Sequence, residues 1–262
     1  MKESCANING GKNKGYVMKI KLLYAVLFLF IPNFLYGKQQ KKMAVYVIYT
    51  SSHEQMFVES FLPSIQAFDD YEIVIDKFEQ ECPSGVYMKQ GWVGTMRHKV
   101  DLIIRAIKEN WGDIFIYADV DIQFFGITQQ LLRELMIGKD LLVQKDNPGG
   151  EMCAGFFVCR GNERTLNLWQ AIKSRLSPSV SDQPNLNRLV RFSNPYKVIW
   201  GYLPVEHFCG AGTFNGEVWK PGQSFKIPKT ILMHHANYTK GIENKLLQLL
   251  YVRETVERRK SV

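Results

Sequence analysis

Short apolar segments of strand length alternate with stretches of helical periodicity from residue 44 onward. Segment 114–118 is a continuous apolar run that suits the buried centre of a parallel sheet, and residues 95–109 place apolar side chains at helical spacing. This alternation predicts an α/β fold, with a mostly parallel central sheet and helices on both faces. The other predicted strands are 44–50, 71–75, 140–144, 154–159, 197–203 and 230–235, and the other predicted helices begin near His53 or span 163–176 and 242–258.

The positive charge of the chain is concentrated near its start. Residues 1–42 hold eight lysines and one acid, whereas the remaining 220 residues carry 25 basic and 24 acidic side chains. A nucleic-acid-binding protein needs a basic face on the folded domain itself, and this nearly neutral part offers none. We therefore predict no nucleic-acid partner, a leader over residues 1–42, and a single domain over residues 43–262.

The leader contains an apolar core at 22–36, preceded by Lys19 and Lys21. A basic segment followed by about 7–15 apolar residues is typical of a secretory signal, and a membrane span usually needs about 20. We predict a signal peptide or a signal anchor, which would associate with a membrane through residues 22–36; a buried core helix is the alternative. The expected location is the Golgi or endoplasmic reticulum lumen of a eukaryotic cell, or a bacterial cell envelope.

Two carboxylates, Asp119 and Asp121, follow the apolar strand at 114–118. Ligands of open α/β sheets bind beyond the carboxyl ends of the strands, and residues at i and i+2 of an extended chain share one side. Such a pair can hold a hard cation such as Mg²⁺, although a solvated pair at a strand end is also common. Because Phe124 and Phe125 follow, we expect the acids to form an exposed turn between two buried segments.

Polar side chains also end two other predicted strands. Thr50 and Ser51 follow the first strand, where they can cap the next helix, and His234 and His235 end the strand at 230–235. Side chains alternate along a strand, so one histidine should face inward and the other outward. An imidazole ligand beside the two carboxylates would favour Mn²⁺ over Mg²⁺.

Several further residues are candidates on weaker grounds. Arg97 and Lys99 are predicted near the start of a helix, and Lys245 opens the helix at 242–258, where each is a diphosphate contact or a solvated charge. Gly155 interrupts an apolar run, which suggests a close backbone approach to a ligand or a tight bend. Asp182, in Asp182-Gln183-Pro184, is either a helix cap or part of a catalytic pair with Gln183.

Four segments together resemble the nucleotide-diphospho-sugar transferase family of GT-A glycosyltransferases. In chain order they read IYADVDIQFF, AGFFVCRGNERTLNLW, DQPNLN and HHANYTKGIENKLLQLLYVR, and the resemblance covers roughly residues 44–253. It implies a Rossmann-like GT-A fold and a metal-dependent glycosyltransferase that uses Mn²⁺ or Mg²⁺. The implied donor is a nucleotide-diphospho-sugar, and the acceptor is a glycan, a protein or a lipid.

The resemblance also implies roles for particular residues. Asp119 and Asp121 would be the DxD metal ligands, with His235 of the His-x-Asn pattern as the third, and Asp182 and Gln183 would be catalytic residues near the sugar and acceptor. Cys153 stands where many members of the family carry asparagine before Ala-Gly. With the two candidates added by position, Arg97 and Gly155, the expected donor-binding residues are Thr50, Ser51, Arg97, Lys99, Gly155 and Lys245.

Two other functions stay open at this point. A DxD phosphohydrolase would use Asp119 as nucleophile and Asp121 as acid, although Gln123 stands where threonine or valine is usual. A non-catalytic module that binds sugar nucleotides or glycans would keep the same motifs without turnover.

Overall fold

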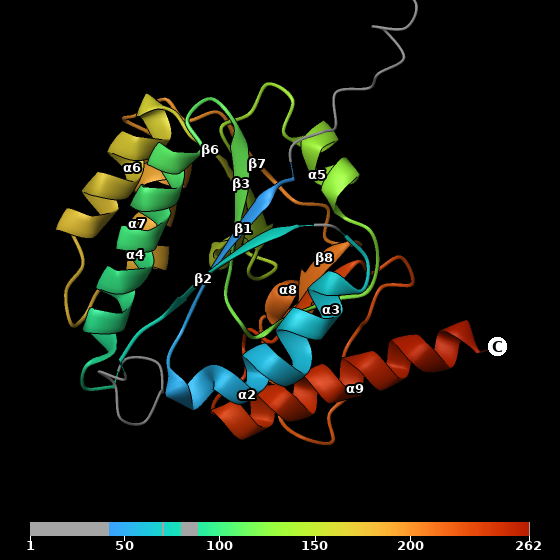
Figure 1. Ribbon diagram of the computed structural model, residues 1–262. Helices are drawn as coiled ribbons and strands as arrows, with labels where there is room; N and C mark the ends of the chain where they lie inside the picture. Colours follow the sequence, from blue (N-terminus) through green and yellow to red (C-terminus); the bar gives the residue numbers. More distant parts are fainter. Residues whose placement is uncertain (1–41, 70, 80–88, 262) are drawn as a thin grey trace, which may run out of the picture. The chain divides into compact units, whose positions relative to one another are not determined.

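The computed structural model describes residues 42–69, 71–79 and 89–261 (Figure 1). From Lys42 onward these residues belong to one compact unit, Lys42–Val262. The predicted leader, with its apolar core at 22–36, lies outside the described residues except for Lys42. None of the helices in the described part of the chain is long and apolar enough to cross a membrane.

Among the described residues, the central sheet contains six strands, five of which run in the same direction. Their spatial order is β2 (Glu72–Lys77), β1 (Ala44–Tyr49), β3 (Ile114–Ala118), β6 (Met152–Arg160), β5 (Leu141–Lys145) and β7 (Trp200–Tyr202). The β1–β2, β1–β3 and β5–β7 pairs are parallel, and β6 alone is antiparallel to its neighbours β3 and β5. The prediction of an α/β fold with a mostly parallel central sheet is confirmed.

Successive side chains of a strand point to opposite faces of the sheet, and here the side chains on both faces are apolar. Helices therefore cover both faces. On one face, Phe157 of β6 packs with Trp169 and Ile103 of the helices in one core cluster, and on the other face Phe156 packs with Phe57 and Phe61. Figure 1 shows α4, α6 and α7 together on the first face. The elements of that first layer are α4 (Trp92–Glu109), α6 (Glu163–Ser174) and α7 (Asp182–Leu186), which continues as a π-helical segment, Asn187–Phe192.

The second face is covered by shorter elements. A 3₁₀ turn, Ser51–His53, leads into α2 (Glu54–Met56), a π-helical segment (Phe57–Phe61) and α3 (Leu62–Gln66), and α5 (Gln129–Leu135) lies farther along the chain. Thr50 occupies the cap position before Ser51, but its side chain makes no capping hydrogen bond. Its hydroxyl lies 3.2 Å from that of Ser52 instead, so the predicted capping role is wrong.

The histidine strand belongs to a second, three-stranded sheet rather than to the central one. Its strands are β4 (Ile122–Phe124), β9 (Met233–His235) and β8 (Phe208–Gly210), followed by α8 (Gly212–Asn215) and, after β9, by α9 (Ile242–Lys260). The predicted strand at 230–235 is therefore too long, and the strand observed there lies outside the central sheet. The chain turns after Asp121 directly into β4, which pairs antiparallel with β9, and Ile122 lies opposite His235.

Helix α4 begins earlier than its apolar periodicity predicts, because Trp92 is buried and extends its apolar face. Lys99 therefore lies well inside the helix rather than at its start. Residues two positions apart on a helix point about 200° apart, so Arg97 and Lys99 lie on different faces. Lys99 is buried and Arg97 is exposed.

Candidate metal centre

Three side chains converge at the carboxyl end of β3. Asp119, Asp121 and His235 each offer one ligand atom, and these atoms all lie within 4.8 Å of one another. The acids follow β3 directly, and pairing of β4 with β9 places the histidine beside them, where the backbone N–H of Ala236 donates to the carbonyl of Asp121 at 2.8 Å. Two carboxylates and one imidazole form a donor set that suits Mg²⁺ or Mn²⁺.

Asp121 is buried, with only 6% of its side chain exposed. Its Oδ2 lies 2.5 Å from Nζ of Lys245, and its Oδ1 lies 3.3 Å from Nε2 of His235. Burial alone would raise the pKa of Asp121, but Lys245 and His235 outweigh that effect and hold the pKa well below its usual range. The expectation that both acids form an exposed turn is therefore wrong for Asp121, because the ammonium group of Lys245 compensates its buried charge.

Asp119 is more accessible and shares a cation with Asp182. Its side chain is 34% exposed, and its Oδ1 accepts a hydrogen bond from the hydroxyl of Tyr117 at 2.7 Å. The ammonium of buried Lys99 lies 3.3 Å from Asp119 Oδ1 and 3.0 Å from Asp182 Oδ2. Burial alone would lower the pKa of Lys99, but the two carboxylates raise it. Lys99 therefore links the strand end to the start of α7.

Gln183 follows Asp182 in the chain and lies in a polar network with Ala154 and Asp146. Its Oε1 accepts from the backbone N–H of Ala154 at 3.1 Å, and its Nε2 donates to Asp146 Oδ2 at 3.0 Å. The other carboxylate oxygen of Asp146 accepts from the amide of Asn237 at 2.9 Å. Burial raises the pKa of Asp146. The network joins α7 to the segment that follows His235.

Gly155 lies against two of the three candidate ligands, His235 and Asp119. A Cβ atom at this position would come within 2.4 Å of Cε1 of His235 and 2.7 Å of Oδ2 of Asp119. The carbonyl of Gly155 also accepts from the backbone N–H of Asp119 at 2.8 Å. In this structure the glycine allows candidate ligands to approach the backbone.

Replacing Gly155 with alanine should lower the free energy of unfolding by about 1–3 kcal/mol, because the added methyl group overpacks the site. With the cluster assigned as a metal site, the methyl group should also weaken Mn²⁺ binding by displacing His235. Chemical denaturation and Mn²⁺ titration would measure the two effects. Gly149→Ala is the matched control, because its Cβ would meet only the flexible end of Asn147 at 3.1 Å. Equal behaviour of the two variants would contradict this role for Gly155.

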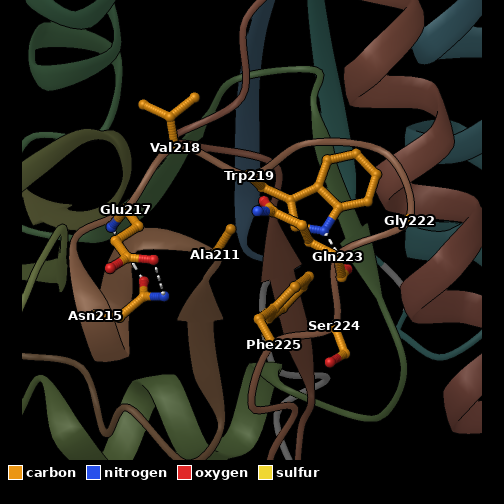
Figure 2. Close-up of a pocket in the computed structure, with 9 residues that line it drawn as sticks. All are labelled: Ala211, Asn215, Glu217, Val218, Trp219, Gly222, Gln223, Ser224 and Phe225. Carbon is orange, nitrogen blue, oxygen red and sulfur yellow. Dashed lines mark hydrogen bonds between the residues drawn. The ribbon is translucent and has the colours of Figure 1, made fainter.

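The two histidines of β9 face different surroundings, although both are buried. His235 faces the acids, whereas His234 stacks on Phe225 with ring centroids 5.4 Å apart. Phe225 also lines a hollow of about 370 Å³, which Figure 2 shows together with the Asn215–Glu217 hydrogen bonds and the Trp219–Gln223 hydrogen bond. Because neighbouring side chains of a strand point to opposite sides, this hollow lies on the other side of β9 from the acids.

Of the remaining predicted donor-binding residues, Lys245 contacts the cluster formed by Asp119, Asp121 and His235. Lys245 contacts Asp121 directly, as described above, from the first turn of α9. Thr50 is buried and Ser51 is exposed at the carboxyl end of β1, and burial together with the charge of Lys245 lowers the pKa of the nearby His53. The donor-binding roles of Thr50, Ser51 and the exposed Arg97 stay predictions.

Sequence reasoning missed three residues of this site. Tyr117 contacts Asp119, Asp146 holds Gln183 and Asn237, and Gln144 contacts His235 with its Oε1 2.8 Å from Nδ1. Gln144 and Asp146 both lie at the carboxyl end of the apolar run Leu141–Val143. The rule that singled out Asp119 would have found them, had it been applied to every strand.

This sheet, with polar and acidic residues gathered at its carboxyl edge, has the architecture of the GT-A class. The chain belongs to the nucleotide-diphospho-sugar transferase family, whose model matches residues 56–249. No curated protein matches the chain significantly in sequence.

Solved glycosyltransferase structures resemble the chain at low sequence identity. The enzyme involved in glycosylation of the major capsid of PBCV-1 is 10% identical with a TM-score of 0.53, over 80% of this chain and 100% of that one, and shows the fold. GlyE of Streptococcus pneumoniae is 14% identical with a TM-score of 0.44, over 64% of this chain and 46% of that one, so the match spans less than half of its length. Mouse xyloside xylosyltransferase 1 is 10% identical with a TM-score of 0.45, over 75% and 98% of the two chains.

Proposed function

We propose that this protein is a metal-dependent glycosyltransferase that moves a sugar from a nucleotide-diphospho-sugar to a glycan, protein or lipid acceptor. The observation that carries the proposal is the cluster of Asp119, Asp121 and His235, flanked by Lys99 and Lys245, in a member of this family. We assign the three clustered residues as ligands of Mn²⁺ or Mg²⁺.

The proposed chemistry depends on charge. Breaking the bond between the sugar and the diphosphate leaves negative charge on the departing nucleotide, and a bound divalent cation would stabilise that charge. Lys245 supplies a further ammonium group at the same place, held by Asp121 and only partly exposed. We assign Lys245 as a contact of the diphosphate.

We assign the sugar end of the site to Asp182 and Gln183. Both lie at the start of α7, and Asp182 shares Lys99 with Asp119, which supports placing this segment beside the donor. Asp182 is buried and paired, while Gln183 is held by Ala154 and Asp146. Fixed oxygen atoms near an oxocarbenium-like sugar would stabilise its positive charge.

A donor screen tests the proposal. The protein would be incubated with a panel of nucleotide-diphospho-sugars and Mn²⁺ or Mg²⁺, and released nucleoside diphosphate would be measured with and without a chelator. Metal-dependent release from one donor is the expected result. Phosphate release from simple monoesters would favour a phosphohydrolase instead, and donor binding without release would favour a binding module.

We also propose that residues 22–36 direct the protein into the secretory pathway or anchor it to a membrane. The support is the apolar segment behind Lys19 and Lys21. Fractionation of cells expressing the full chain would test this, with a chain lacking residues 1–41 as the control. The same fraction for both chains would contradict it.

A further inference from the structure

A buried amide lies behind the candidate histidine ligand. Gln144, at the carboxyl end of β5, is completely buried, and its Oε1 lies 2.8 Å from Nδ1 of His235. On the other side of the ring, Nε2 lies 3.3 Å from Oδ1 of Asp121. The imidazole is therefore held between a glutamine and the acidic pair.

We propose that Gln144 is a positioning residue that keeps the proton of His235 on Nδ1, so that Nε2 turns its lone pair toward Asp119, Asp121 and a divalent cation. This inference rests on the proposed function, because it presumes that the cluster binds metal. A neutral imidazole carries one N–H, and an Nδ1–H that donates to Gln144 leaves Nε2 free to act as a ligand. The opposite tautomer would direct Nε2–H at Asp121 and could not bind metal. Histidine ligands commonly donate their second ring N–H to an oxygen in this way.

An irregularity in the sheet places Gln144 in this position. Val143 of β5 lies opposite Phe157 of β6, whereas the next residue, Gln144, lies opposite Cys153. Residues 154–156 of β6 lie between these two pairs and have no counterparts in β5. Bulges of this kind re-aim side chains and are frequent beside active sites. This bulge contains Gly155, which leaves room for His235 beside the backbone. The same bulge therefore admits His235 and orients Gln144.

Two observations favour Gln144 over its neighbour as the partner of the ring. Sγ of Cys153 also approaches Nδ1, but at 3.5 Å, and burial raises the pKa of this thiol well above its usual range, so that it stays a weakly interacting S–H group. Nε2 of Gln144 is buried without a hydrogen-bond partner among the described residues. An unpaired buried N–H costs stability, so packing alone does not explain a glutamine here.

The chain contains a matched control. His234, the neighbour of His235, has its Nε2 3.1 Å from Oε1 of Gln248, and both residues are completely buried. The His234 ring stacks on Phe225, away from the acids. This second glutamine–histidine pair has the same chemistry and similar burial, but its histidine is not part of the candidate metal cluster.

The experiment is a Mn²⁺ titration of the full chain, with free Mn²⁺ measured by electron paramagnetic resonance. Gln144→Leu should weaken Mn²⁺ binding by about 10–100-fold, Gln144→Glu should preserve it because an acceptor oxygen remains, and Gln248→Leu should leave it unchanged. Thermal unfolding would verify that each variant is folded. Equal affinities for Gln144→Leu and the unaltered protein would overturn the inference and leave the proposed function intact. No Mn²⁺ binding by the unaltered protein would overturn both.

The tautomer can be read without any substitution, which covers the case in which Gln144→Leu does not fold. Long-range proton–nitrogen NMR of the unaltered protein should show the ring proton of His235 on Nδ1. A proton on Nε2 would overturn the assignment.

Discussion

Replacing Asp121 with asparagine should lower metal-dependent release of nucleoside diphosphate by about 1,000-fold, equivalent to about 4 kcal/mol of transition-state stabilisation. The change removes one of the two carboxylates that we propose as metal ligands. It also leaves Lys245 without the carboxylate oxygen that lies 2.5 Å from its ammonium group. Initial rates at saturating Mn²⁺, combined with Mn²⁺ titration, would measure the loss and show whether it follows from metal binding.

Asp101→Asn is the matched control for this substitution. Asp101 pairs with Lys173 on the surface of α4, where both side chains are about half exposed, so its removal should leave turnover unchanged. Turnover by Asp121→Asn within about twofold of the unaltered protein would remove Asp121 from the metal site.

Replacing Lys99 with methionine should cost about 3–5 kcal/mol of unfolding free energy, the usual effect of removing one partner from a buried ion pair. Lys99 and Asp182 are each only 5% exposed at the side chain, and Asp119 shares the same ammonium group. Methionine fills similar space but leaves Asp182 as a buried charge without its cation. Urea denaturation followed by circular dichroism would measure the difference.

Two comparisons test whether the loss of unfolding free energy in Lys99→Met comes from burial of the ion pair. Lys77→Met breaks an exposed pair with Glu54, whose side chains are 44% and 47% exposed, and should cost less than about 1 kcal/mol. The double variant Lys99→Met with Asp182→Asn should recover part of the lost stability, because the unpaired charge is gone. A cost below about 1 kcal/mol for Lys99→Met alone would contradict the described network.

The fold was largely predictable because its signals are local. The buried strands β1 and β3 are continuous apolar runs, β5 begins with one at Leu141–Val143, and α4 carries apolar side chains at helical spacing. The sequence does not indicate which sheet contains β9, because three residues carry too little periodicity to specify a partner strand. Its pairing with β4 depends on the turn at Asp121, which no local pattern describes.

The candidate site was predictable where polar residues lie close together in sequence at the end of an apolar strand, as at Asp119 and Asp121 and at His234 and His235. Its electrostatics were not, because the cation that compensates Asp121 lies 124 positions away at Lys245. Gln144 follows the apolar run Leu141–Val143 and is a strand-end candidate by position, but nothing in the sequence indicates that it contacts His235. Its orientation comes from a bulge that only the pairing of β5 with β6 reveals.

The thermodynamic coupling between Mn²⁺ and a nucleoside diphosphate tests the proposed metal-dependent transferase most directly. Isothermal titration of the unaltered protein with nucleoside diphosphates, in the presence and absence of Mn²⁺, would measure it. We expect Mn²⁺ to tighten binding of at least one nucleoside diphosphate by about tenfold or more, and Asp121→Asn to abolish this gain. Equal affinity with and without Mn²⁺, across all the nucleotides tested, would contradict this expectation.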